Sequence, residues 1–367
     1  MSVRIDRSGD TWRKKRGQEL LFSGTVGTLI LAGGAGSRLG FLGPKGTFIV
    51  TPFSKKSLFQ LALERVRAAS IQSGCELPVA ILTSPLNREE TANFLEEHDY
   101  FGLLRDQVTL FEQKMLPLLD EEGKPILLPS GLIAEGADGN GYVCREFVLS
   151  GVCEAWRERG IEYVTLIPID NILADPFDVE LCGYHDLMGN EITVKAIEAL
   201  DPEERVGRLL EQNGKLDVVE YSELSCAQKN ELLYAYSGLL CFSLSFIAKT
   251  VNIELPVHIA CKQMFGKTAY KRERFIFDLL KYATSSALLY SREEVFAPIK
   301  ELSDLTSSLE LLFAFNRRIF YQVTGVVPPR EAFELDAAFY YPTEAFLREW
   351  KDKSVPHDKV IIRGKIE

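Results

Sequence analysis

The sequence of 367 residues is poor in the side chains that build metal clusters and disulfide frameworks. It has four histidines, and its seven cysteines occur singly, with no C-x-x-C pair among them. This pattern argues against a zinc ribbon or a disulfide framework and predicts reduced thiols, as in a cytoplasmic protein. An apolar run of about 18 residues is also missing, and the basic start MSVRIDRSGDTWRKKRG has no apolar core, so we expect neither a membrane span nor a secretory signal.

The sequence has fewer basic residues (42 Lys and Arg) than acidic ones (52 Asp and Glu). The formal net charge of −10 argues against a general nucleic-acid surface, so we expect no nucleic-acid partner. An anionic ligand would need local lysines and arginines, together with a divalent cation, to offset this charge. The length and a hydrophobic content of 46% allow one large domain and a small second one. We expect the large domain over residues 1–300, with a short helix over 10–22, and a small C-terminal region over 301–367.

Apolar residues alternate between strand-like runs and helical spacing. The runs at 26–32, 78–83 and 163–168 are typical of buried strands, whereas 58–69 and 87–97 have the periodicity of helices. Strands that alternate with helices predict an α/β fold with a mixed, mostly parallel sheet and helices on both faces. Such sheets bind ligands beyond the carboxyl ends of their strands.

A glycine-rich loop follows the first of these strands. Gly33, Gly34 and Gly36 lack a Cβ, so the backbone can turn sharply there and approach a ligand. A loop of this kind offers bare N–H groups to an anion. Arg38 can fork two phosphate oxygens and Lys45 supplies a compact point charge, so the stretch predicts a polyphosphate site.

Two common glycine motifs do not fit this loop. A dinucleotide fingerprint counted from Gly34 has Leu39 where the third glycine belongs, and no acidic residue closes a second strand at the usual distance. The one Gly-Lys-Thr triplet of the chain has Cys261 at the place of the first P-loop glycine. A tight turn without a ligand is the remaining alternative, but it does not explain the arginine and the lysine that follow.

The stretch Ile30–Lys45 resembles the signature L-x-x-G-G-x-G-T-R-L-G-x-x-x-P-K of the uridylyltransferases that make UDP-sugars, and within them the UDP-N-acetylglucosamine pyrophosphorylase branch, with Ser37 at the threonine place. The resemblance implies a Rossmann-like, GT-A-like nucleotidyltransferase domain over 1–300. It also implies UTP and a sugar-1-phosphate as substrates and Mg²⁺ as cofactor. The three glycines would cradle the nucleotide, and Arg38 and Lys45 would hold the triphosphate as catalytic residues.

Two further segments are similar to the nucleotide pocket of this family. Gln113 stands in the family's F-x-Q before Leu-Pro, and Gly139 and Asn140 stand in its P-D-G-N-G-G segment, with Ala137 and Tyr142 as departures. The resemblance implies that Gln113 reads the uracil edge, that Gly139 binds the nucleotide and that Asn140 binds the sugar. Without the resemblance, Asp-Gly and Asn-Gly pairs are also common in ordinary turns.

A carboxylate and a lysine complete the phosphate end of the predicted site. Asp170 follows the strand over 163–168 and matches the family's V-D-N, which implies a Mg²⁺ ligand; alternatively it only caps the next turn. Lys300 matches the family's R-x-x-E-F-A-P-x-K and would draw the attacking phosphate toward the nucleotide as a third catalytic residue. The alternative is a solvated surface lysine.

The sugar end of the predicted site lies around a hairpin, which the Asn213-Gly214 pair predicts. The flanking segments resemble the family's E-x-V-G and V-E-Y-S-E, so Gly207, Glu220 and Tyr221 are implied to bind the sugar. A solvated glutamate on an exposed strand is the alternative for Glu220.

The stretch 233–242, LYAYSGLLCF, departs from the family's F-N-A-G-N-I-A-N-H-F. It has no asparagine, and Ser237 or Gly238 stands at the place of the substrate-binding amide. An unmade polar contact is worth on the order of 1–3 kcal/mol, which weakens the expected preference for an acetamido sugar. The resemblance as a whole still implies a uridylyltransferase that forms a UDP-sugar and pyrophosphate from UTP and N-acetylglucosamine-1-phosphate. Glucose-1-phosphate as the substrate, and a non-catalytic nucleotide-sugar binding relative, are the alternatives.

Overall fold

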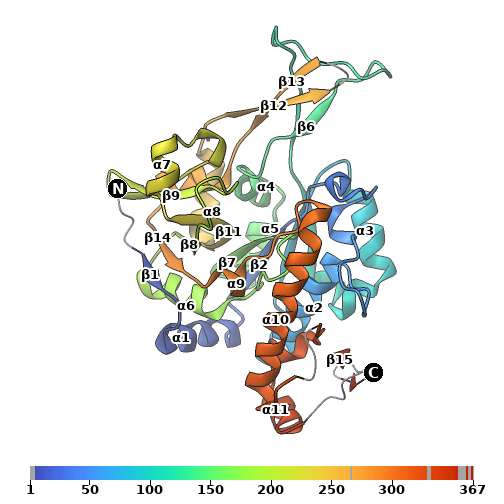
Figure 1. Cartoon of the computed structure of the whole chain (residues 1–367), viewed down its shortest axis with the longest axis vertical. Helices are drawn as coiled ribbons and strands as arrows, with labels where there is room; N and C mark the ends of the chain where they lie inside the picture. Colours follow the sequence, from blue (N-terminus) through green and yellow to red (C-terminus); the bar gives the residue numbers. More distant parts are fainter. Residues whose placement is uncertain (1–4, 265–266, 329–331, 354–360, 363–364, 367) are drawn as a thin grey trace.

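The computed structural model describes residues 5–264, 267–328, 332–353, 361–362 and 365–366. Within them the chain is built around a ten-stranded sheet (Figure 1). Eight of its strands follow the order β1-β14-β8-β11-β7-β2-β3-β4, and the other two, β9 and β10, are joined through β11. The strands are β1 (Asp6–Arg7), β2 (Val26–Leu31), β3 (Val79–Thr83), β4 (Val108–Glu112), β7 (Tyr163–Pro168), β8 (Ile192–Glu198), β9 (Arg208–Gln212), β10 (Lys215–Val219), β11 (Tyr234–Ser243) and β14 (Ser285–Leu289).

The sheet is mixed but mostly parallel, as the sequence predicts. Strands β7, β2, β3 and β4 run parallel to one another, whereas β11 runs antiparallel to both β7 and β8. In the register of β2 and β7, Leu31 pairs with Pro168. Because these two strands end side by side, the loops that follow them meet at one edge of the sheet.

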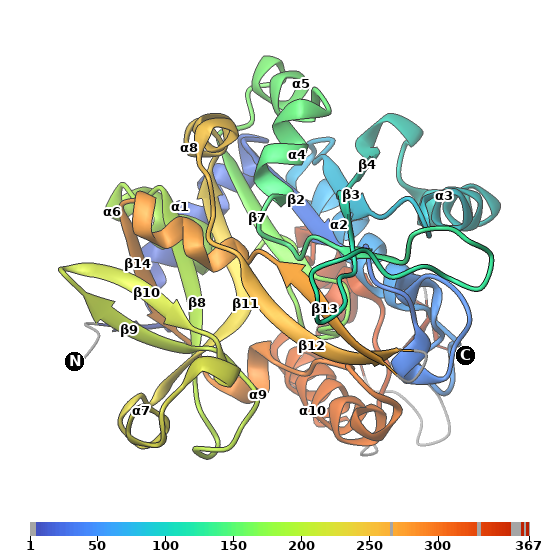
Figure 2. The same cartoon turned by 90° about the horizontal axis from the view of Figure 1, so that it is seen from above.

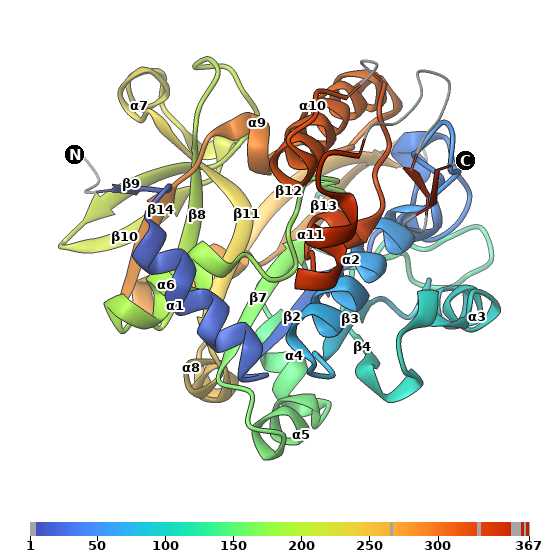
Figure 3. The same cartoon turned by 90° about the horizontal axis from the view of Figure 1, so that it is seen from below.

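Helices cover both faces of the sheet. Alternate residues of each strand point to opposite sides, so each strand packs against helices of two layers. Ile30 packs into the layer that contains α1 (Thr11–Phe22), α2 (Leu58–Ser73), α6 (Val179–Met188) and α10 (Leu305–Thr324). Leu29 packs into the layer that contains α4 (Val143–Leu149), α5 (Val152–Glu158) and α8 (Leu244–Lys249). Figure 3 shows α1, α2 and α6 in front of the sheet.

The local signals of the sequence explain where these elements begin and end. Ser57 caps α2 by accepting the N–H of Gln60 at 3.1 Å, and Gly74 ends this helix in the left-handed conformation. Asn213 and Gly214 both have positive φ, which is the backbone of a tight hairpin turn between β9 and β10.

Two antiparallel pairs extend from the sheet beyond one of its edges; Figure 1 shows β6 beside β12 and β13, and Figure 2 shows β12 and β13 crossing above the sheet. They are β5–β6 (Met115–Pro117 with Glu135–Ala137) and β12–β13 (His258–Met264 with Lys267–Glu273), and a bridge between Leu119 and Tyr270 joins them. The remaining elements are α3 (Arg88–Glu97), α7 (Cys226–Glu231), α9 (Arg292–Val295), α11 (Glu344–Trp350), β15 (Ile361–Ile362) and β16 (Lys365–Ile366).

The C-terminal part has an aromatic cluster of its own. Phe320 of α10 packs with Phe333, Phe339 and Trp350, and Asn316 of α10 donates to the Phe333 carbonyl at 2.8 Å. The division of the chain at residue 300 stays a prediction. No helix in the described part of the chain is both long and apolar enough to cross a bilayer.

Candidate active site

A cleft of about 730 Å³ lies at the edge of the sheet where β2, β4 and β7 end. The loops after these strands form its floor, and β5, β6 and β13 contribute its opposite wall. Nine of the predicted site residues line this cleft: Gly33, Gly34, Arg38, Lys45, Gln113, Gly139, Asn140, Asp170 and Lys300. Residues from widely separated parts of the sequence are therefore brought to one place.

The glycine loop is closed by its own backbone. Gly36 donates to the Gly43 carbonyl at 2.9 Å, and Lys45 donates to the Gly34 carbonyl at 3.1 Å. The residues with positive φ are Gly40 (65°) and Gly43 (147°), and not the three glycines that the sequence singles out for sharp turns. The turn itself thus depends on the later glycines of the loop.

Gly33 and Gly36 are needed because other side chains of the protein lie close to their backbone. A Cβ on Gly33 would lie 2.4 Å from the Gln113 amide nitrogen, which instead donates to the Gly33 carbonyl at 3.4 Å. A Cβ on Gly36 would lie 2.7 Å from the Phe41 ring, whereas Gly34 faces open space. The N–H of Gly34 has no hydrogen-bond partner among the described residues, so it is available to a ligand in the cleft.

Lys45 and Asp170 form an ion pair on the floor of the cleft. Lys45 Nζ lies 2.7 Å from Asp170 Oδ2, and the two side chains are 14% and 23% exposed. This pairing follows from the parallel register of β2 and β7, because each residue lies in the loop after one of these strands. Within the described residues no backbone N–H donates to the Asp170 carboxylate, so the capping alternative has no support.

Asn171 fixes the segment that carries Lys300, and the sequence reasoning overlooked it. Its buried amide donates to the Val295 carbonyl at 2.7 Å and accepts the N–H of Ala297 at 2.9 Å. Ile299 N then donates to the Asp170 carbonyl at 2.8 Å. The only signal in the sequence was the position of this asparagine directly after Asp170.

Lys271 of β13 is a fourth cation of the cleft that the sequence reasoning also missed. Its stem packs against Gly136 of β6, where an added Cβ would lie 2.9 Å from Lys271 Cε, and its ammonium pairs with Glu273. No local pattern marks this residue, because only the fold of the hairpin carries it across to the cleft.

The segment with Gly139 and Asn140 is held against residues 274–276. Gly139 has a φ of 75°, and a Cβ there would lie 2.2 Å from the Arg274 carbonyl oxygen, so the position requires glycine. Arg274 Nη1 lies 2.6 Å from Asp138 Oδ1, and Asn140 Oδ1 accepts the N–H of Ile276 at 3.1 Å. Burial raises the pKa of Asp138, and the Arg274 charge opposes this rise.

The predicted sugar residues Gly207, Glu220 and Tyr221 do not line the cleft; they lie beside it. A Cβ on Gly207 would lie 3.8 Å from Glu220 Oε2, and Tyr221 is 40% exposed at the start of a short 3₁₀ turn. Burial raises the pKa of Glu220, while the positive charge of Lys300 counteracts it. This group therefore lies toward the Lys300 end of the cleft.

An aromatic wall continues from this group. Phe275 and Phe277 stack with ring centroids 5.0 Å apart, and the His258 ring lies 4.9 Å from Phe275. His258 Nδ1 lies 2.7 Å from Glu223 Oε1 and Nε2 lies 2.9 Å from Asp278 Oδ2. Burial by itself would lower the pKa of His258, but the two carboxylates outweigh it and raise the pKa above 6.5.

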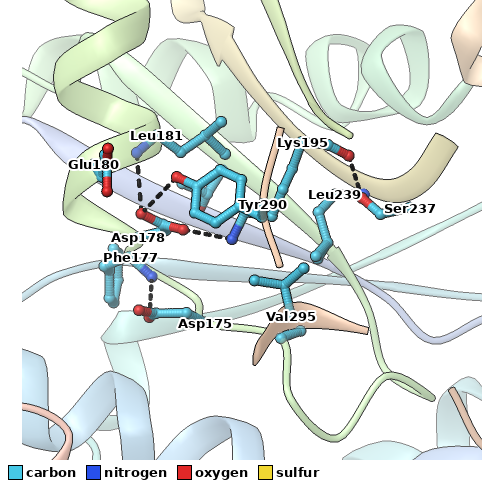
Figure 4. A network of polar contacts seen from close by, with 12 residues as sticks. Asp175, Phe177, Asp178, Glu180, Leu181, Lys195, Ser237, Leu239, Tyr290 and Val295 are labelled. Carbon is cyan, nitrogen blue, oxygen red and sulfur yellow. Dashed lines mark hydrogen bonds and ion pairs between the residues drawn. The ribbon is translucent and has the colours of Figure 1, made fainter. Parts of the chain in front are cut away.

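The stretch at the place of the family's asparagine contains a β-bulge in β11, between Tyr236 and Leu240. Ser237 is buried and donates its hydroxyl to the Lys195 carbonyl, as Figure 4 shows. Its side chain therefore points into the core. Gly238, with a φ of 81°, lies next to Pro168 at the end of β7, so it is the residue of the stretch nearer the cleft.

No group of three or more histidine, cysteine, aspartate or glutamate side chains that could hold a metal ion occurs in the described part of the chain. Asp170 places a carboxylate in the cleft beside Lys45. Mg²⁺ commonly takes one or two carboxylates and completes its shell with substrate phosphates and water. Asp170 could therefore supply one carboxylate ligand to such an ion.

Comparison with known proteins identifies the family. The family model described as UTP–glucose-1-phosphate uridylyltransferase matches residues 10–351, so the chain belongs to this family of uridylyltransferases. UDP-N-acetylglucosamine diphosphorylase 1 of Arabidopsis thaliana is 35% identical over 318 residues, which are 79% of this chain and 63% of that protein. The chain thus spans less than two thirds of this relative.

Solved structures agree with the family. A candidate UDP-N-acetylglucosamine pyrophosphorylase from Entamoeba histolytica superposes with a TM-score of 0.89 at 26% identity, covering 99% of this chain and 100% of that one. A UDP-N-acetylglucosamine pyrophosphorylase from Trypanosoma brucei, in complex with an inhibitor, gives a TM-score of 0.77 at 27% identity and covers 88% of this chain and 73% of the other. The α/β architecture predicted from the sequence is confirmed.

Proposed function

We propose that this protein transfers a uridylyl group from UTP to a sugar-1-phosphate, giving a UDP-sugar and pyrophosphate. The observation that carries this proposal is the gathering of Arg38, Lys45, Lys271 and Lys300 in one cleft, where Lys45 pairs with Asp170, in a protein whose net charge is −10. Four cations in an otherwise acidic chain suit a substrate with several phosphates.

In the proposed reaction an oxygen of the sugar-1-phosphate attacks the α-phosphorus of UTP, the bond to the β-phosphate breaks, and pyrophosphate leaves. A phosphate monoester is already ionised near neutral pH, so the step needs no general base. The work of the protein is to align the two phosphates and to neutralise developing charge. We assign Lys45 and Arg38 to the triphosphate, and Lys300, held next to Asp170, to the attacking phosphate.

We assign Asp170 as the residue that would hold Mg²⁺, which supplies charge neutralisation on the phosphates when it is bound. The N–H groups of the glycine loop would face the nucleotide phosphates. Gln113 lies over Gly33 at the entrance to this loop, where it supports the assignment to the uracil edge.

For the sugar we propose N-acetylglucosamine-1-phosphate, in line with the names of the related proteins from Arabidopsis and Trypanosoma. Glucose-1-phosphate remains the second candidate for a specific reason. The stretch 233–242 contains no asparagine or glutamine, and its Ser237 is turned into the core, so neither an amide nor this hydroxyl is offered to an acetamido group. We also propose a cytoplasmic location, which all seven cysteines as free thiols support.

The test is pyrophosphate release from UTP and Mg²⁺ with N-acetylglucosamine-1-phosphate and glucose-1-phosphate in parallel. Release with either sugar supports the transfer reaction, and the ratio of kcat/KM values decides between the sugars. UTP binding in a thermal-shift assay without pyrophosphate release from UTP in the presence of any sugar-1-phosphate would replace the proposal by a non-catalytic nucleotide-sugar binding protein.

A further inference from the structure

We propose that the C-terminal part of the chain positions the Lys45–Asp170 pair, through a clamp made of Glu334, Tyr340 and Tyr341. The inference rests on the proposed function, because it concerns how the assigned catalytic Lys45 and the assigned Mg²⁺ ligand Asp170 are held. The three clamp residues do not line the cleft. Glu334 acts on the loop after Lys45, and the two tyrosines act on the loop after Asp170. Figure 3 shows the C-terminal helices α10 and α11 beside α2.

Glu334 holds the loop that begins with Lys45. Its buried carboxylate accepts the N–H of Phe53 at 2.7 Å through Oε1 and the N–H of Ser54 at 2.8 Å through Oε2, and it also accepts the Ser54 hydroxyl. A single carboxylate thus receives three donors from a segment 280 residues away in the sequence. Charge-assisted hydrogen bonds of this kind are among the strong ones in proteins.

A series of hydrogen bonds within the loop connects the Glu334 contact to Lys45. Lys56 N donates to Thr51 Oγ1 at 2.7 Å and Val50 N donates to the Lys56 carbonyl at 2.9 Å, which closes the turn that Glu334 grips. Phe48 N donates to the Lys45 carbonyl at 3.1 Å. The carboxylate therefore fixes one end of a compact loop whose other end is the catalytic lysine.

Tyr340 and Tyr341 hold the loop that begins with Asp170. The Tyr341 hydroxyl donates to Asp175 Oδ1. The Tyr340 ring lies 4.4 Å from the guanidinium of Arg65, which donates to the Ala174 carbonyl at 2.8 Å.

The far end of the Asp170 loop is fixed to the sheet. Asp178 pairs with the buried Lys195 of β8 and accepts the Tyr290 hydroxyl at 3.2 Å, as Figure 4 shows. The middle of the loop, at 174–175, is held by Tyr341 directly and by Tyr340 through Arg65. Loss of these contacts would free the middle of the loop while leaving its far end in place.

The clamp is expected to affect the reaction rate because it sets the distance between two residues of the cleft. The two loops approach from different strands, and a displacement of about 1 Å at reacting groups can cost on the order of 100-fold in rate. Holding both loops from one C-terminal segment sets the position of Lys45 relative to Asp170. We expect the clamp to raise kcat by this route while UTP affinity depends on it less.

The experiment uses the full chain with two substitutions and two matched controls. Glu334→Gln keeps the shape of the side chain but removes its charge, and Tyr341→Phe removes one hydroxyl. The controls are Glu344→Gln, whose side chain is 93% exposed, and Tyr321→Phe, whose residue is 51% exposed on α10.

Hydrogen exchange is the first readout, because it needs no substrate. Glu334→Gln is expected to speed exchange about tenfold or more in residues 45–56 and to leave 169–178 unchanged, and Tyr341→Phe is expected to do the reverse. Trypsin should also cut faster after Lys55, which is exposed at the turn, in Glu334→Gln alone. Equal acceleration of both segments by either variant, or none, would overturn the clamp.

Turnover is the second readout. Each clamp variant is expected to lower kcat by about 10- to 100-fold with a smaller change in KM for UTP. In the background of Lys45→Ala, the Glu334→Gln change should cost little more, because the lysine it positions is gone. A full further loss in that background would assign Glu334 a general structural role. Absence of pyrophosphate release from the wild-type protein would refute the proposed function, and the exchange data would still decide the clamp.

Discussion

The sharpest test of the proposed chemistry is the removal of the Lys45 ammonium. Lys45 Nζ lies 2.7 Å from Asp170 Oδ2 and the side chain is 14% exposed, so its charge acts in a partly water-excluded site. Removing one preorganised charge donor of this kind typically costs about 3–4 kcal/mol of transition-state stabilisation, or roughly 10²- to 10³-fold in kcat. We expect Lys45→Ala to show a loss of this size, and Lys45→Arg an intermediate one, because guanidinium geometry differs from that of an ammonium.

The assay is pyrophosphate release with UTP saturating and the sugar-1-phosphate varied. The KM for the sugar-1-phosphate is expected to change by less than about threefold, since Lys45 is assigned to the nucleotide. Lys249 of α8, whose side chain is 66% exposed, provides the control variant, Lys249→Ala. A KM increase as large as the kcat decrease would refute the assignment, as would a kcat within about threefold of the wild type.

A second substitution, at Asp170, tests the electrostatic part of this reasoning. In Lys45→Ala the carboxylate loses its counter-charge and faces the triphosphate directly, so UTP binding without a divalent cation should weaken. Adding Asp170→Asn should restore part of that affinity, because the repelling charge is removed. Titration calorimetry of the two variants with UTP measures the difference, and no recovery would contradict the electrostatic reasoning.

Three further predictions concern the surroundings of the cleft. Asn171→Ala removes two buried hydrogen bonds to the segment before Lys300, so urea unfolding should show a loss of about 2 kcal/mol or more and turnover should fall. Gly139→Ala is expected to destabilise by more than about 1 kcal/mol, because alanine disfavours a φ of 75° and its methyl meets a carbonyl oxygen; unchanged thermal stability would contradict this. The raised pKa of His258 means that its contribution to stability is complete below its unfolded-state pKa and is lost as pH rises through the folded-state pKa above 6.5. His258→Gln should therefore lower Tm more at about pH 6 than at about pH 9, and an equal loss at both values would refute the linkage.

Much of this protein could be predicted because the signals are local. The segment 163–168 is an apolar run between turn signals, and it is a strand with the same bounds in the structure. The cap at Ser57 and the Asn213-Gly214 turn also depend on residues within a few positions of each other. The stretch Ile30–Lys45 carries its glycines, arginine and lysine in one short segment, which was enough to indicate the family.

Other features depended on pairs far apart in the chain, and these only the tertiary structure could decide. The ion pair of Lys45 with Asp170 requires the parallel register of β2 and β7, and Lys271 reaches the cleft through a hairpin that no local pattern directs there. The sequence predicts a close approach at Gly33, but only the structure shows that Gln113 is the group that leaves no room for a side chain there. Local propensity is encoded within a few residues, whereas contacts across 80 or more residues, such as the one between Gly33 and Gln113, are fixed only when strands pair and layers pack.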